Sequence, residues 1–132
     1  MRTSKKLTPV FVAIVIALSA CSEDDGATVR IESGQSFEPE VLTVSVNESV
    51  TFVSETADAH TVTAYEGRLP DGASFFASGG FESEDEARDD LAGGLLSSGE
   101  SFEATFDTVG TYQYFCIPHE SSGMSGRIVV EE

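Results

Sequence analysis

Apolar and polar residues alternate in several short runs along most of the chain. The run "ATVRIES" places Val29 and Ile31 on one side and polar or charged residues on the other. Phe102, Ala104 and Phe106 share one side of "SFEATFD" in the same way. A period of two is typical of strands with one buried face. The pattern recurs in five further runs, which are "EVLTVSV", "SVTFVS", "HTVTAY", "TYQYFC" and "GRIVVEE".

Turn-forming segments separate these runs. They include "SGQS", "VNES", "LPDG", "SSGE" and "DTVG", and their Gly, Pro, Asn, Asp and Ser residues suit tight turns. Many short strands with regular turns predict an all-β sandwich or barrel. Only residues 83–96 have a helical character, and two adjacent glycines limit them to a short turn of helix. The sequence shows no internal repeat and no second domain.

The first 20 residues have the features of an export signal. Three basic residues precede about 14 mostly apolar residues, and small residues lead up to Cys21. This order is typical of a signal peptide, and the apolar run is shorter than the roughly 20 residues that span a bilayer, although a short transmembrane anchor is the alternative. The residues "LSAC" resemble the lipobox, in which the cysteine receives a lipid and becomes the new N-terminus. We therefore expect a lipoprotein signal peptide at 1–20, lipidation of Cys21, a short acidic tether at 21–27 and a folded domain at 28–132.

Removal of this signal peptide would leave a very acidic chain. All 23 acidic residues but only four of the seven basic residues follow residue 20, which gives a net charge of −19. Such a surface repels nucleic acid phosphates and anionic lipid headgroups, so we expect neither as a partner. Strong acidity suits solubility at high salt, where screening limits self-repulsion. It favours a halophilic source over an acidic protein of ordinary waters.

The segment "FCIPHESSGM" gathers the residues with the most distinctive chemistry. Cys116 ends one predicted strand, Met124 starts the next, and His119 lies in the loop between them. The other histidine, His60, opens the run "HTVTAY", so only the fold can bring it close. With Cys21 lipidated, Cys116 has no disulfide partner, and a lone exported thiol is a liability unless it is buried or bound to metal.

Two histidines, one thiolate and one thioether form a soft ligand set that suits copper in both oxidation states. Zinc would prefer a tetrahedral set without the thioether, and iron–sulfur clusters would need more cysteines. A binuclear copper site would need a second cysteine. Each of the four residues by itself is more often an ordinary core or surface residue. All four together at this spacing favour a single mononuclear copper site.

The segment "YFCIPHESSGM" resembles the Cys-x-x-His-x4-Met loop of plastocyanins and halocyanins, which are small blue copper proteins of the cupredoxin family. The similarity covers about residues 27–130 and includes "FEPEVLTVSVNESVTFVSETADAHTV". The acidity and the expected lipid attachment favour the halocyanins within that group. The resemblance implies an all-β, eight-stranded Greek-key β-sandwich with copper at one end. It also implies the copper ligands, which are His60, Cys116, His119 and Met124.

The same resemblance implies a function. It predicts a type 1 (blue) copper electron carrier, not an enzyme, that shuttles single electrons between membrane-associated redox partners outside the cytoplasmic membrane. The expected partners are a cytochrome complex or a terminal oxidase, with the membrane contacted through the lipid anchor and the carrier itself a monomer. Electrons would leave through the ring edge of His119. A copper chaperone or storage protein and a metal-free adhesion module are the competing hypotheses.

Some positions depart from the plastocyanin pattern. Thr61 follows the first ligand where plastocyanins often have Asn, so the hydrogen bond by which that Asn ties the ligand loops together is not carried over. Ala59 stands where a Pro is common. Phe115 replaces a Tyr that plastocyanins expose at a remote electron-transfer patch, so a phenol-dependent path is not supported. The alternation in "TYQYFC" also predicts that Phe115 points outward.

Two further features each have an ordinary interpretation. "NES" at Asn47 matches a glycosylation sequon, but Asn47 is equally suited to a turn between strands. The acidic run 82–90 resembles the docking patch of plastocyanins, but at molar salt its field would fade within a few ångströms. We favour a solvated acidic face for this run.

Overall fold

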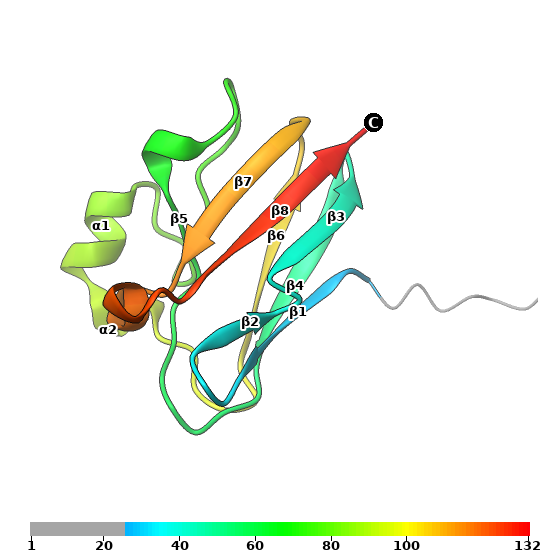
Figure 1. Cartoon of the computed structure of the whole chain (residues 1–132). Coiled ribbons are helices and arrows are strands. Elements are labelled where there is room, and N and C mark those ends of the chain that lie inside the picture. The colour runs from blue at the N-terminus through cyan, green and yellow to red at the C-terminus, as the bar shows by residue number, and fades with distance from the viewer. Residues whose placement is uncertain (1–25) are drawn as a thin grey trace, which may run out of the picture.

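The computed structural model describes residues 26–132, which form two four-stranded sheets packed face to face (Figure 1). The strands are β1 (Thr28–Glu32), β2 (Ser36–Glu38), β3 (Val41–Ser45), β4 (Glu48–Ser54), β5 (Thr63–Ala64), β6 (Ser101–Phe106), β7 (Gly110–Phe115) and β8 (Ser125–Glu131). One sheet has the order β2-β1-β4-β6 and the other has the order β3-β8-β7-β5. The predicted eight-stranded Greek-key sandwich is confirmed. The predicted signal peptide and Cys21 lie outside the described residues.

Most neighbouring strands are antiparallel, but β1 with β4 and β3 with β8 are parallel. Parallel neighbours cannot be joined by a tight turn, and the chain instead crosses between the two sheets at every connection from β2 to β7. Strands β7 and β8 form an antiparallel pair of six residue positions at the centre of their sheet. The connection between these two strands carries Cys116, His119 and Met124, so the central pair of strands anchors the candidate site.

The core between the sheets is rich in aromatic rings. Phe52 and Tyr114 meet edge to face with ring centroids 5.2 Å apart, and Phe106 and Tyr112 do so at 4.9 Å. Ile31, which the alternation places inside, is fully buried. Burial of a large apolar side chain contributes about 1.5–3 kcal/mol, and such dense packing resists deformation. The sandwich therefore gives the loops at its end a stiff frame.

The predicted helical segment forms two short helices, α1 (Glu84–Asp89) and α2 (Leu91–Gly94). The Ser83 side chain caps α1 by accepting a hydrogen bond from the backbone N–H of Glu86 at 3.2 Å. Figure 1 shows both helices beside β5, near the connection that follows β7. This arrangement confirms that the segment forms no more than short turns of helix.

Two 3₁₀ helices, η1 (Glu66–Arg68) and η2 (Ile117–Ser122), complete the fold. We predicted η2 as a loop, and the structure shows instead a compact helical segment. Pro118 suits the first turn of this helix because that position needs no N–H donor. Gly123 ends it in the left-handed conformation at φ 82°. The tight winding shortens the path between the two strands that flank the site.

The run "HTVTAY" differs from its prediction as a half-buried strand. Only Thr63–Ala64 are paired as a strand, and every residue from 60 to 64 is buried. Residues 76–78 pair along the free edge of this run, where Ala64 N–H donates to Phe76 C=O at 3.0 Å and Val62 N–H donates to Ser78 Oγ at 3.0 Å. Helix α1 also contacts β5. Because the run is enclosed in this way, the alternation of polar and apolar residues does not report an exposed face here.

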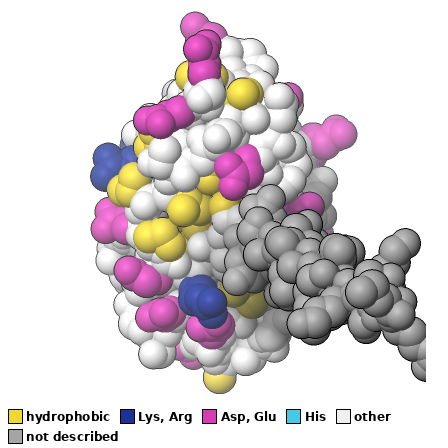
Figure 2. Space-filling model, turned by 90° about the vertical axis from the view of Figure 1, so that its right-hand side faces the viewer, with side chains coloured by type: hydrophobic (Ala, Val, Ile, Leu, Met, Phe, Trp, Pro, Cys, Tyr) yellow, Lys and Arg dark blue, Asp and Glu magenta, His cyan; other side chains and the backbone are white. Residues whose placement is uncertain are grey.

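Acidic side chains are spread over the molecular surface and outnumber the basic ones on the face shown in Figure 2. Within residues 26–132, all four basic residues are arginines, and Arg30 pairs with Glu55. None of the helices in the described part of the chain has the length and hydropathy that a membrane crossing requires.

Candidate metal centre

Three of the four predicted ligands meet at one end of the sandwich. Cys116 Sγ lies 3.4 Å from Nδ1 of His119 and 3.7 Å from Nδ1 of His60. A ligand atom of each of these three residues lies within 4.8 Å of those of the others. His60 reaches the site because its backbone pairs with Leu96, with N–H to C=O bonds in both directions. The structure thus brings together residues that are 56 positions apart in the chain.

Cys116 directly follows β7, immediately before η2, and is fully enclosed. Burial raises the pKa of its thiol, while hydrogen bonds from the backbone of Thr61 and His119 act in the opposite direction. The Thr61 N–H points to Sγ at 3.4 Å, which is a favourable contact for a thiolate. A thiol in such an enclosed place is hard to ionise without a positive partner, and a bound metal ion would supply one.

His60 is 1% exposed and its imidazole is packed against the ring of His119, with centroids 4.8 Å apart. Burial lowers the pKa of His60, and the proximity of His119 lowers it further, so the imidazole is neutral at neutral pH. A neutral imidazole is the form that binds metals. Within residues 26–132, Nε2 of His60 has no hydrogen-bond partner. His119 is only half-buried, so one of the two rings is near the surface.

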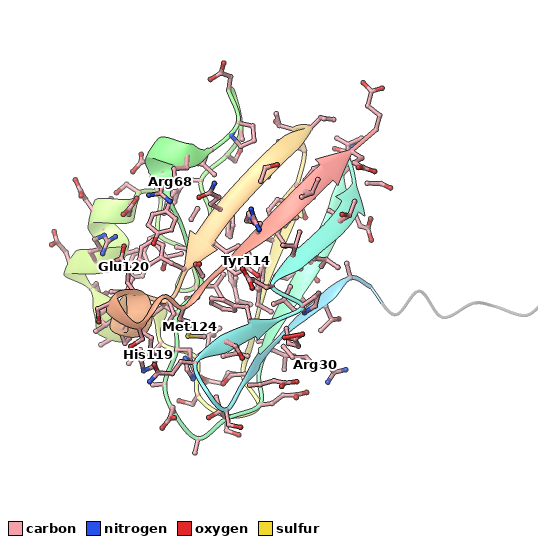
Figure 3. All side chains as sticks on the ribbon, viewed as in Figure 1. Arg30, Arg68, Tyr114, His119, Glu120 and Met124 are labelled. Carbon is pink, nitrogen blue, oxygen red and sulfur yellow. The ribbon has the colours of Figure 1, made fainter. Side chains whose placement is uncertain are left out.

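Met124 is 2% exposed and is tied to the other ligands through its backbone. Its C=O accepts a hydrogen bond from Cys116 N–H at 3.1 Å, and its N–H donates to His119 C=O at 3.2 Å. These bonds close the connection between β7 and β8 into a compact unit. Figure 3 shows Met124 and His119 at the same end of the molecule. All four predicted metal residues therefore lie in one region, while the predicted lipid site at Cys21 is outside the described residues.

Thr61 restores a link between the two ligand loops. Its Oγ1 accepts a hydrogen bond from the backbone N–H of Ile117 at 2.8 Å. The plastocyanin resemblance does not carry this link over because Thr replaces Asn at this position. The structure shows that a threonine hydroxyl serves instead, because it is buried and faces the start of η2.

Phe115 has the predicted outward direction but is not exposed to solvent. It lies on the outer face of β7 but is fully buried, because the ring of Tyr65 stacks on it at 4.1 Å and the guanidinium of Arg88 lies 4.6 Å from its centroid. Tyr65 also donates a hydrogen bond to Glu120 at 3.2 Å. A phenol thus does lie beside Phe115, although it comes from another segment.

Arg88 joins helix α1 to the ligand loop. It forms ion pairs with Glu84 at 2.7 Å and with Glu120 at 2.8 Å. Hydrogen bonds from Arg88 hold the pKa of Glu120 below its usual range. Sequence reasoning missed this role, and the only signal for it was the four-residue spacing between Glu84 and Arg88, which is that of a helical ion pair.

The donor set fits a soft transition metal that changes oxidation state. One thiolate, two imidazoles and a thioether match copper. The packing that encloses the Cys116 sulfur keeps water away from the site. Of the four side chains, only His119 is more than slightly exposed. The arrangement therefore suits electron exchange through one ring better than binding and transformation of a substrate.

Comparison with protein families and curated proteins agrees with this geometry. The model of the copper binding proteins of the plastocyanin/azurin family matches residues 26–131. The plastocyanin of Scenedesmus fuscus is 37% identical over 108 residues, which cover 82% of this chain and 92% of the relative. The plastocyanin of Prochlorothrix hollandica is 30% identical over 137 residues, covering 97% of this chain and 95% of the relative.

Solved structures share the same architecture. A reduced amicyanin variant matches with a TM-score of 0.60 and 27% identity, over 82% of this chain and 84% of that one. The purple cupredoxin from Nitrosopumilus maritimus matches with a TM-score of 0.59 at 21% identity, over 80% and 99% of the two chains. The second match supports the fold alone.

Proposed function

Because the chain belongs to the plastocyanin/azurin family of copper-binding proteins, we propose that it is a type 1 (blue) copper electron carrier whose metal is held by His60, Cys116, His119 and Met124. Copper is the cofactor, and the protein is an electron-transfer protein and not an enzyme. The observation that carries the ligand assignment is the meeting of His60, Cys116 and His119 within 4.8 Å.

The protein's own part in the function is to hold the ligands still. Bound copper supplies the one-electron chemistry. Cys116 is held by the N–H of Thr61, and the Thr61 hydroxyl holds the start of η2 in turn. Ligands that keep their places in both oxidation states reduce the reorganisation that accompanies electron transfer. The buried thioether of Met124 would tune the potential as a weak axial ligand.

His119 is the natural exit for the electron. It is the ligand nearest to the surface, and it is flanked in η2 by the half-buried Ile117 and the exposed Pro118. The exposed Ala57 and Ala59 belong to the segment that leads to His60. Asp58 stands between these two alanines and is also exposed. The surroundings of His119 are therefore mostly small and apolar with one carboxylate nearby, which allows close, short-lived docking of a redox partner.

We assign the location from the sequence. The lipobox-like "LSAC" supports a lipoprotein signal at 1–20 and a lipid on Cys21, followed by the tether at 21–27 and the copper domain at 28–132. The carrier would then work at the outer side of the cell membrane, between membrane-associated redox proteins such as a cytochrome complex and a terminal oxidase. The acidity and the proposed lipid anchor favour the halocyanins within the family.

Reconstitution with copper tests the proposal. We expect one copper per chain and an intense charge-transfer band in the red part of the visible spectrum, because the Cys116 thiolate donates to the metal. Cys116→Ser should remove that band and leave a folded protein, since Ser is close in size to Cys. Circular dichroism checks the fold of the variant, and Thr43→Ser, at an exposed position of β3, serves as the control substitution.

The outcomes separate the competing functions. A strong band that survives Cys116→Ser would refute the ligand assignment. Copper that binds without any intense band and exchanges readily would favour a chaperone or storage protein. Absence of stoichiometric copper would favour a metal-free binding module.

A further inference from the structure

The arginines of residues 26–132 fall into two groups. Arg30 pairs with Glu55, and Arg88 pairs with two glutamates, so both have carboxylate partners. Within the described residues, Arg68 and Arg127 have no carboxylate at ion-pair distance, although 20 of the 23 acidic residues lie in this part of the chain. Two unpaired arginines are unexpected in so acidic a protein, because carboxylates are abundant everywhere on its surface.

Arg68 and Arg127 line the same pocket. Its volume is about 210 Å³, and it opens on the outer face of the sheet that contains β7 and β8. The remaining lining residues are mostly polar, namely Glu40, Tyr65, Gln113, Ser125 and Gly126. The only concentration of positive charge without carboxylate partners in the described structure is therefore located in one concave site.

The pocket is organised before anything binds. Arg68 donates a hydrogen bond to Gln113 at 3.0 Å, and its guanidinium lies over the ring of Tyr65 at 4.4 Å. Tyr65 is in turn fixed by its stacking on Phe115. Figure 3 shows Arg68 at the edge of the sheet beside β7. Most of the five N–H donors of its guanidinium stay available for a ligand.

Arg127 is placed by the strand register. It lies opposite Gln113 on the neighbouring strand β8, and Gln113 is the residue that binds Arg68. The two positive charges therefore stand on either side of one neutral amide. Like charges at such positions repel each other. An anion bound between them would be attracted by both and would offset this repulsion.

We propose that this pocket binds the carboxylate of an Asp or Glu side chain presented by the redox partner of the copper carrier, so the proposal rests on the function given above. A carboxylate is planar and matches the guanidinium fork in a bidentate manner. It carries one negative charge, which suits a pocket that also contains Glu40 better than a doubly charged phosphate does. A single receptive point on an otherwise negative surface fixes the orientation of an acidic partner.

Nuclear magnetic resonance of the copper(I)-loaded protein tests the site directly. The probe is a blocked Gly-Glu-Gly peptide, with blocked Gly-Gln-Gly as the uncharged control. We expect the Glu peptide to shift the side-chain signals of Arg68, Arg127 and Gln113, and the Gln peptide to leave them in place. Arg68→Gln and Arg127→Gln should each weaken peptide binding about tenfold, as expected for loss of one charge-assisted hydrogen-bonded pair.

Arg30→Gln is the matched control, because Arg30 is also exposed but already pairs with Glu55 on the opposite sheet. It should leave peptide binding unchanged. Equal shifts with both peptides, or unchanged binding in the Arg68 and Arg127 variants, would overturn the proposal. Tighter binding of inorganic phosphate than of the Glu peptide would also overturn it and show a site for free anions. Each sample is then reoxidised to copper(II), and its visible spectrum reports on the copper centre separately, so failure of the electron-carrier function is distinguishable from failure of this pocket.

Discussion

Thr61→Val tests the link between the ligand loops. Valine has nearly the same shape but cannot accept the hydrogen bond from Ile117, so a partly buried N–H loses its partner. We expect the free energy of unfolding to fall by about 1–3 kcal/mol and copper to dissociate faster. Thr61→Ser keeps the hydroxyl and should preserve the slow dissociation of copper. Equal dissociation rates in both variants would show that the hydroxyl does not secure the site.

The four candidate ligands could be found from the sequence because cysteine, histidine and methionine are rare in this chain and their chemistry is distinctive. Thr61 could not be found in this way. Threonine is common in strands, and only the fold shows that its hydroxyl meets a backbone N–H 56 residues away. The chemistry of rare residues therefore identifies the candidate metal-binding atoms. The tertiary structure identifies which atoms hold those residues in place.

Met124→Gln tests the axial ligand. The amide oxygen is a harder donor than the thioether, so it stabilises the oxidised copper relative to the reduced form. We expect copper to remain bound and the reduction potential to fall, as measured by redox titration of the visible band. Met124→Leu provides an apolar variant of similar size that supplies no donor. A potential that rises in the Gln variant would contradict an axial role for Met124.

At the scale of secondary structure, the alternation of apolar and polar residues was informative where a strand has one solvent-exposed face. The runs that became β1 and β6 have the predicted faces, with Val29 and Ile31 inside. Alternation did not predict burial where other segments cover the outer face. Phe115 is hidden beneath Tyr65 and Arg88, and these contacts come from segments distant in sequence. The local pattern reports the side of a strand that packs against the opposing sheet, and it cannot report a second covering layer on the other side.

Arg88 connects two such elements, helix α1 and the ligand-bearing η2. Its ion pairs with Glu84 and Glu120 are partly exposed, so we expect Arg88→Gln to lower the free energy of unfolding by less than about 1 kcal/mol. The copper site should respond more clearly, because Phe115 and Glu120 adjoin the ligands Cys116 and His119. We expect broadened copper resonances in electron paramagnetic resonance, which indicate a less uniform ligand geometry.

Arg88→Lys keeps the charge but loses the planar fork of the guanidinium. The width of its copper resonances should therefore lie between those of the wild type and Arg88→Gln. The control is Arg30→Gln, which breaks an exposed ion pair on the other sheet. Copper resonances that are equally sharp in all variants would show that α1 does not influence the ligand geometry.

At the scale of the whole molecule, a stiff sandwich carries a metal site at one end and a nearly uniform negative surface elsewhere. Long-range attraction contributes little to partner choice at high salt, because the Debye length is only about 3 Å at 1 M. Contacts at short range must then decide orientation. The apolar surroundings of His119 and the pocket between Arg68 and Arg127 are two such places. Attachment to a membrane would further limit the search for partners to the surface.

The last prediction concerns that attachment. We expect the native protein to start at Cys21 with a diacylglycerol group, because a single acyl chain binds reversibly and stable anchoring generally takes two. Residues 22–27 would extend to roughly 20 Å at most, which keeps the copper domain close to the membrane. Their acidic side chains would keep this tether solvated.

The mass of the N-terminal peptide of native protein is the decisive measurement, since Cys21→Ala could block processing and leave an uncut precursor in the membrane. A lipid-modified Cys21 together with membrane partition is the expected result. An unmodified Cys21, or a mature start several residues downstream, would instead show a freely diffusing carrier. Its encounters with redox partners would then depend on its concentration in solution and on diffusion in three dimensions, instead of on diffusion along the membrane surface.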